Sequence, residues 1–103
     1  MKIAIESNDG VTLNSPFTRI KGYLVCEINE AGVMASEFRK KSSKVKLQSL
    51  NDCRTIISRG MDRDRFMQLK NRGLDVFITF KSSVNDAIHT FMKESILEKG
   101  SIQ

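Results

Sequence analysis

Few residues in this sequence can perform nucleophilic, acid–base or metal chemistry, and they lie far apart. The single histidine is His89, and the two cysteines, Cys26 and Cys53, have 26 residues between them. A closed zinc site takes four Cys or His ligands, and neither a CxxC pair nor a disulfide framework is present. We therefore expect no zinc or iron–sulfur site built by this chain alone. Binding of a preassembled cluster stays open, because basic side chains and backbone donors could hold one.

The candidate nucleophiles lack partners. No Ser/His/Asp arrangement follows from the spacing, and His89 falls inside the last predicted helix. Cys53 could act as a nucleophile if Arg54 lowered its pKa, but an inert buried thiol ahead of a core strand is the simpler interpretation. The sequence therefore predicts a protein that is not an enzyme.

Several carboxylates could in principle hold magnesium for phosphoryl transfer, but none forms a diagnostic pair. Each has an ordinary role in a turn or at the start of a helix, where an acid complements the helix dipole. These residues are Glu6, Asp9, Asp52, Asp62, Asp64 and Asp86. We assign no metal ligand among them.

Two turns are better candidates for a binding site. Residues 7–10 (SNDG) and 59–61 (RGM) each directly follow a predicted strand of the sheet. In open α/β sheets, ligands bind in the crevice at the carboxyl ends of the strands. Arg59 would lie there close to a helix N-terminus, whose free backbone N–H groups suit an anionic ligand.

The elements that must position these turns follow from hydrophobic periodicity. Residues 22–28 and 33–38 are predicted to form a β-hairpin. Its second arm has no clearly apolar side, which suggests a strand at the edge of the sheet. In the first long helix we expect Phe66 and Leu69 to form the apolar face, and after Leu97 we expect the last helix to fray. A short helix is expected around Val45, Leu47 and Leu50. The predicted order is a strand at 2–6, a hairpin of 22–28 and 33–38, the short helix, a strand at 54–58, a helix at 62–71, a strand at 74–79 and a helix from 84.

Length and composition set the class of protein. The chain has 103 residues, 40% of them hydrophobic and 28% charged, so we expect one α/β domain over residues 1–103. No apolar stretch approaches the roughly 18 residues of a membrane span. The absence of an export signal and the unpaired cysteines favour the cytoplasm.

The net charge of +5 invites a nucleic-acid interpretation. The basic run of Arg39, Lys40, Lys41, Lys44 and Lys46 permits weak, sequence-independent binding, but the remaining positive charge is scattered among acids, and a solvated loop is the favoured explanation.

Several motifs together resemble the dinitrogenase iron-molybdenum cofactor biosynthesis family. They are MKIAIESNDG at 1–10, LNSP at 13–16, Arg19, YLVCE at 23–27, CRTIISRGM at 53–61, GLDVFI at 73–78 and VNDAI at 84–88. The resemblance covers nearly the whole chain. It implies a ribonuclease-H-like α/β fold with a five-stranded mixed sheet. It implies no nuclease activity, because the necessary carboxylate cluster is not recognisable.

The resemblance also implies a carrier that binds the iron-molybdenum cofactor, its precursor or another anionic ligand. The implied contact residues are Asn8, Ser15, Arg19, Arg59 and Gly60. Family members commonly carry a histidine after the Ser-Pro pair, whereas this chain has Phe17 and Thr18 there, and Met61 replaces a common proline after Gly60. The alternative is a protein-interaction or regulatory module that keeps the fold and has lost the cofactor site.

Overall fold

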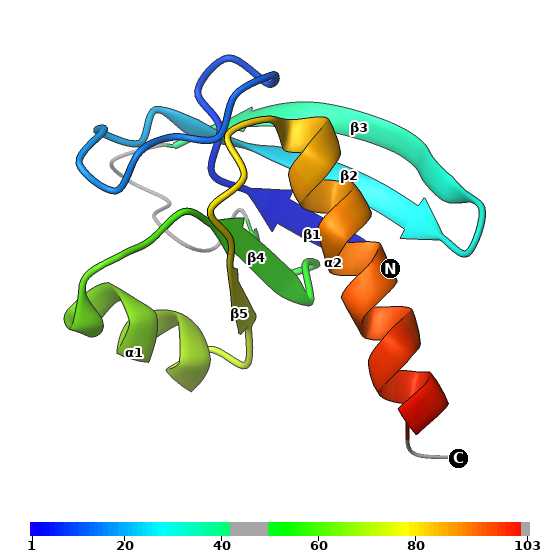
Figure 1. The fold of residues 1–103 in the computed structure, drawn as a ribbon. Helices are drawn as coiled ribbons and strands as arrows, with labels where there is room; N and C mark the ends of the chain where they lie inside the picture. Colours follow the sequence, from blue (N-terminus) through cyan, green and yellow to red (C-terminus); the bar gives the residue numbers. More distant parts are fainter. Residues whose placement is uncertain (42–49, 102–103) are drawn as a thin grey trace.

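A five-stranded mixed sheet organises the protein, with strands in the order β3-β2-β1-β4-β5 (Figure 1). The computed structural model describes residues 1–41 and 50–101, with side chains described to residue 95. The elements are β1 (Lys2–Ile5), β2 (Gly22–Asn29), β3 (Gly32–Lys40), β4 (Thr55–Ser58), α1 (Arg63–Asn71), β5 (Asp75–Ile78) and α2 (Val84–Ser101). The mixed α/β architecture predicted from the sequence is confirmed, and the ribonuclease-H-like assignment stays a prediction.

The central strand β1 divides the core into two layers because alternate side chains of a strand point to opposite faces. Ile3 and Ile5 are fully buried on the face covered by α2, where Ala87 and Phe91 pack. Ala4 faces the opposite core, together with Leu69 of α1. One helix therefore covers each face of the sheet.

The two sides of β1 pair differently. β2 runs antiparallel to β1 and is followed by β3, which confirms the predicted hairpin and places its second arm at an edge of the sheet. β4 and β5 continue the sheet in parallel on the other side. The carboxyl ends of β1, β4 and β5 consequently lie along the same side of the sheet, the side formed by strand ends, where β2 also begins and β3 ends. We call this the loop edge, and its segments are residues 6–21, 41, 59–62 and 79–83.

Backbone hydrogen bonds join the segments of the loop edge. The Leu13 N–H donates to the Ser82 carbonyl and the Val84 N–H to the Val11 carbonyl, both at 2.8 Å. The Thr79 N–H donates to the Ser58 carbonyl at 2.9 Å. The loop after β1 is thus attached to the segment that leads from β5 into α2.

Both long helices begin with side-chain caps. Asp62 accepts a hydrogen bond from the Arg65 N–H at 2.8 Å, and Ser83 accepts one from the Asp86 N–H at 3.2 Å. Gly73 has φ of +84° just after α1, a left-handed conformation that glycine adopts without a Cβ clash. The helix starts follow the sequence signals closely.

Two predicted details of the helices are wrong. Helix α2 continues to Ser101 instead of fraying after Leu97. In α1, Leu69 is fully buried but Phe66 is 37% exposed. The reason is that Arg65, one turn before Leu69, occupies the inward side of the helix and reaches the sheet.

The chain returns to the sheet through residues 50–53. Leu50 is fully buried, whereas Val45 and Leu47 of the predicted short helix lie outside the described residues. Arg39 makes paired contacts of 2.6 and 2.8 Å to the Asp52 carboxylate, and Lys2 Nζ lies 3.1 Å from it. These cations, Arg39 first, hold the pKa of Asp52 well below its usual range. The contact fixes this segment against the ends of β1 and β3.

Replacing Leu69 with alanine is expected to lower the free energy of unfolding by about 2–4 kcal/mol, because the cavity would open in the core beneath α1. Met67→Ala is the matched control, since Met67 lies in the same helix but is 46% exposed, and its cost is expected to stay within about 0.5 kcal/mol. Urea unfolding followed by circular dichroism measures both. Equal losses for the two variants would contradict the burial assigned to Leu69.

Candidate functional site

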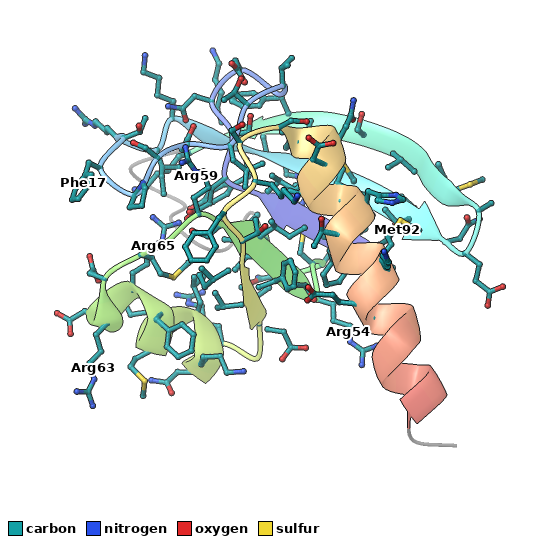
Figure 2. All side chains as sticks on the ribbon, viewed as in Figure 1. Phe17, Arg54, Arg59, Arg63, Arg65 and Met92 are labelled. Carbon is teal, nitrogen blue, oxygen red and sulfur yellow. The ribbon has the colours of Figure 1, made fainter. Side chains whose placement is uncertain are left out.

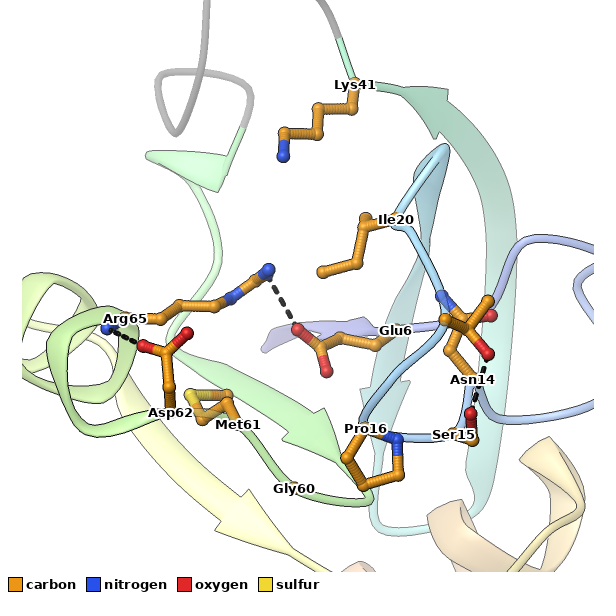
Figure 3. A pocket seen from close by; sticks show the side chains of 11 residues that line it. Glu6, Asn14, Ser15, Pro16, Ile20, Lys41, Gly60, Met61, Asp62 and Arg65 are labelled. Carbon is orange, nitrogen blue, oxygen red and sulfur yellow. Dashed lines mark hydrogen bonds and ion pairs between the residues drawn. The ribbon is translucent and has the colours of Figure 1, made fainter.

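A small polar pocket opens at the loop edge, between the segments that follow β1 and β4 (Figure 3). Its volume is about 130 Å³. The residues around it are Glu6, Asn14, Ser15, Pro16, Thr18, Ile20, Lys41, Gly60, Met61, Asp62 and Arg65. The two turns singled out in the sequence therefore border one hollow.

Glu6 forms the floor of this pocket. It directly follows β1 and is only 4% exposed. Ser58, the last residue of β4, donates its hydroxyl to Glu6 Oε1 at 2.5 Å, and Arg65 Nη2 lies 2.7 Å from Glu6 Oε2. Arg65 also donates to the Tyr23 hydroxyl at 2.7 Å. A single carboxylate thus connects β1, β4 and α1.

Burial raises the pKa of Glu6 above its ordinary value, and this effect exceeds the opposing influence of Arg65, Ser58 and Lys41. The ion contact to Arg65 also leaves hydrogen-bonding capacity unused. Within the described residues, neither Glu6 Oε2 nor Arg65 Nε has an aligned hydrogen-bond partner, although both are buried. The ion pair beneath the pocket is therefore held without full hydrogen bonding of its two side chains.

The predicted contact residue Asn8 is used to hold the loop together. Its side-chain amide donates to the Arg19 carbonyl at 2.9 Å, and its side-chain oxygen accepts from the Lys21 N–H at 2.8 Å. Asn14 exchanges two further hydrogen bonds with Asn8, at 2.9 and 3.1 Å. Both amides are occupied within the loop, so Asn8 positions the site from outside the pocket.

Ser15 and Gly60 line the pocket, as expected from the sequence. The Ser15 and Thr18 hydroxyls lie 2.7 Å apart, so one donates to the other and one proton stays free for a ligand. Gly60 has φ of +152°, and a Cβ there would lie 3.1 Å from Pro16 Cγ. Glycine therefore lets the two loops approach each other.

Arg19 and Arg59 are placed on the loop edge but outside the pocket lining. Figure 2 shows Arg59 on the segment beside the loop that carries Phe17. The helix N-terminus expected to attract an anion is already capped by the Asp62 carboxylate. The cations that border the pocket are Lys41 and Arg65 instead.

Sequence reasoning missed Lys41 and Arg65. Lys41 lies in a basic run that looks like any solvated loop, and only the fold brings it near Glu6. Arg65 carried a usable signal, because it precedes the buried Leu69 by four residues and must share its helix face. A charged residue at such an inward position calls for a buried partner.

Comparisons with known proteins assign the chain to a family. The model of the dinitrogenase iron-molybdenum cofactor family matches residues 1–94. This chain belongs to that family. A comparison with curated proteins finds no match.

Solved structures agree with the family fold. A crystal structure of a Methanocaldococcus jannaschii protein, provisionally described as a dinitrogenase, has a TM-score of 0.77 at 16% identity, over 91% of this chain and 89% of that chain. A Thermotoga protein provisionally described as a NifB protein has a TM-score of 0.66 at 22% identity, over 89% of this chain and 87% of that chain. At these identities the likeness concerns the fold alone.

The side chains most often used as metal ligands lie away from the pocket of this member of the dinitrogenase iron-molybdenum cofactor family. Cys26 and Cys53 are buried in the two cores, and burial raises the pKa of Cys53 to about 11 and also raises that of Cys26. His89 is exposed on α2, away from the pocket. Among the described residues, no group of three or more His, Cys, Asp or Glu could hold a metal ion. The pocket instead offers two cations, two hydroxyls and two carboxylates, those of Glu6 and Asp62.

The raised pKa of Glu6 predicts a pH effect on stability. Above pH 4.5, its ordinary value, the unfolded chain loses the Glu6 proton before the folded chain does, so stability falls as the pH rises through the interval between the two pKa values. The free energy of unfolding of wild type minus that of Glu6→Gln should therefore decrease from acidic to neutral pH. Urea unfolding across this range measures it.

Glu30→Gln controls for the loss of one negative charge, since Glu30 lies in the exposed hairpin turn. A wild-type advantage over Glu6→Gln that grows with pH would mean that the ion pair with Arg65 outweighs burial, and it would contradict a raised pKa for Glu6.

The two thiols are expected to be unreactive in the folded protein, because burial disfavours the thiolate that attacks a disulfide reagent. Labelling with Ellman's reagent near pH 8 should be about a hundredfold slower in the native protein than in guanidinium chloride, where both thiols react. Rapid labelling of one native thiol would restore a cysteine as a candidate nucleophile or cluster ligand.

Proposed function

We propose that this protein is a non-catalytic accessory protein that binds an iron–molybdenum-type cluster or another anionic ligand at the loop edge. The observation that carries the proposal is the polar pocket between the segments after β1 and β4, in a chain of the dinitrogenase iron-molybdenum cofactor family. This is the crevice where ligands bind in open α/β sheets. In this proposal the cluster is cargo that the protein carries. We further propose that the protein acts in the cytoplasm and that its fold is of the ribonuclease-H-like type.

The size of the pocket limits how such cargo would bind. A cavity of about 130 Å³ has room for only a few heavy atoms. An anionic substituent of the cargo would enter the pocket, and the bulk of a cluster would lie over its mouth. Lys41 and Arg65 would attract the negative charge, while the free Ser15 or Thr18 proton would donate a hydrogen bond.

The chemistry of the pocket favours a carrier over an enzyme. Glu6, the titratable group on the pocket floor, is held between Ser58 and Arg65. The Ser58 hydroxyl lies at hydrogen-bond distance from the Glu6 carboxylate, but Ser58 is fully buried and is not part of the pocket lining, so a substrate in the pocket would not reach it. Ionic and hydrogen-bond contacts without thiolate or imidazole ligands suit reversible binding and release.

The test is anaerobic mixing of the purified protein with isolated iron-molybdenum cofactor, followed by gel filtration and iron analysis. Iron should elute with wild type, and Lys41→Glu should reduce the bound iron about tenfold because it reverses a charge at the pocket. Arg54→Glu is the matched control, since Arg54 lies before β4, at the opposite edge of the sheet (Figure 2). The absence of iron from the wild-type peak, or equal loss in both variants, would refute the proposal.

A further inference from the structure

Three apolar side chains protrude from the loop edge. Phe17 is 97% exposed, Phe80 is 92% exposed and Val11 is 69% exposed. Figure 2 shows Phe17 at the outer end of its loop, pointing away from the sheet. Exposing an aromatic side chain so fully forfeits the stabilisation that burial would give. Such residues gathered on one edge indicate an interaction surface.

The loops that carry these side chains are neighbours. Val11 is hydrogen-bonded through its carbonyl to Val84, shortly after Phe80. Pro16, the neighbour of Phe17, lies against Gly60. The Gly60 N–H donates to the Ser58 hydroxyl, and the Ser58 carbonyl accepts from the N–H of Thr79, the residue before Phe80. The three apolar side chains therefore stand on neighbouring loops of the same edge.

The loop edge that carries these apolar side chains is also rich in positive charge. The cations of the loop edge are Arg19, Lys21, Lys41, Arg59 and Lys81. Among the described residues, none of the five forms an ion pair. The acids of the same edge are engaged: Glu6 contacts Arg65, Asp9 accepts from two backbone N–H groups, and Asp62 caps α1. The edge therefore combines an excess of positive charge with exposed apolar side chains.

We infer that the loop edge is a docking surface for an acidic protein partner whose face has apolar sockets for Phe17 and Phe80. Aromatic anchors at the centre and charges at the rim form a typical protein–protein interface. The five cations select an acidic partner by charge complementarity and speed its association. Because the pocket opens at this edge, the partner would cover it.

Two other occupants fit less well. A second copy of this chain would bring the same cations against one another in a two-fold contact, which is repulsive. Single-stranded nucleic acid would use cations, but it needs aromatic faces that lie as platforms for stacked bases. Phe17 and Phe80 protrude from loops, and the aliphatic Val11 beside them offers no stacking face.

Site-specific photo-cross-linking in cells of the source organism tests the inference. In separate full-length proteins, Phe17 and Phe80 are replaced with p-benzoyl-phenylalanine. Both positions should cross-link to one and the same protein, and mass spectrometry should map the links to an Asp- and Glu-rich face of that protein. Met34→p-benzoyl-phenylalanine is the control, because Met34 is 63% exposed on β3 away from this edge, and it should give no such product.

Titration of the purified partner with the metal-free protein then tests the energetics. Phe17→Ala and Phe80→Ala should each weaken binding about thirtyfold. Arg19→Glu combined with Arg59→Glu should slow association about tenfold at low salt, while Arg54→Glu should leave it unchanged. Binding by metal-free protein keeps this result separate from cluster binding.

Other outcomes would overturn the inference. They are cross-links to nucleic acid or to a second copy of the chain, no cross-link from positions 17 and 80, and an equal product from Met34. Tight binding of a labelled thymidine oligonucleotide of about 15 nucleotides at physiological salt would favour nucleic acid instead.

Discussion

Burial of the Glu6 carboxylate at the end of β1 is the constraint on which the loop edge depends. A buried carboxylate must be hydrogen-bonded or paired, and the partners come from two different elements, Ser58 of β4 and Arg65 of α1. The Arg65 side chain in turn reaches Tyr23 of β2. The position of α1 relative to the sheet is therefore fixed by polar contacts at one end and by Leu69 at the other.

The framework could be predicted well from the sequence, because strands, caps and turns are local features. The hairpin was predicted at its observed place, and the predicted helix starts at 62 and 84 lie within one residue of the observed ones. The site was predicted less well because it depends on contacts between distant residues. Ser15 and Gly60 line the pocket. Asn8 does not, because its side chain is used in hydrogen bonds within the loop, and Arg19 and Arg59 also lie outside the lining. Nothing in the local sequence around Lys41 distinguishes it from its basic neighbours.

The pocket of this chain lacks the Cys and His side chains that most often bind metals, although its family is named for a metal cofactor. The dinitrogenase iron-molybdenum cofactor family is named for a metal cluster, whereas in this chain the cysteines belong to the core and the histidine lies on α2. Where a family member offers no thiolate or imidazole near its pocket, charge and hydrogen bonding are the remaining means of holding an anion. These contacts are also those that salt and a competing partner weaken most readily.

None of the described helices has the length and hydrophobicity needed to span a lipid bilayer.

The paired amides of Asn8 and Asn14 have a consequence for binding thermodynamics. Their hydrogen bonds close the loop of residues 6–21 on itself, so its conformation is set before any ligand arrives. Ordering a loop upon association ordinarily consumes part of the interaction free energy. In this protein that entropy is lost during folding of the chain. Even a few weak polar contacts in the pocket can then contribute almost fully to affinity, and the ligand can leave without the loop unfolding behind it.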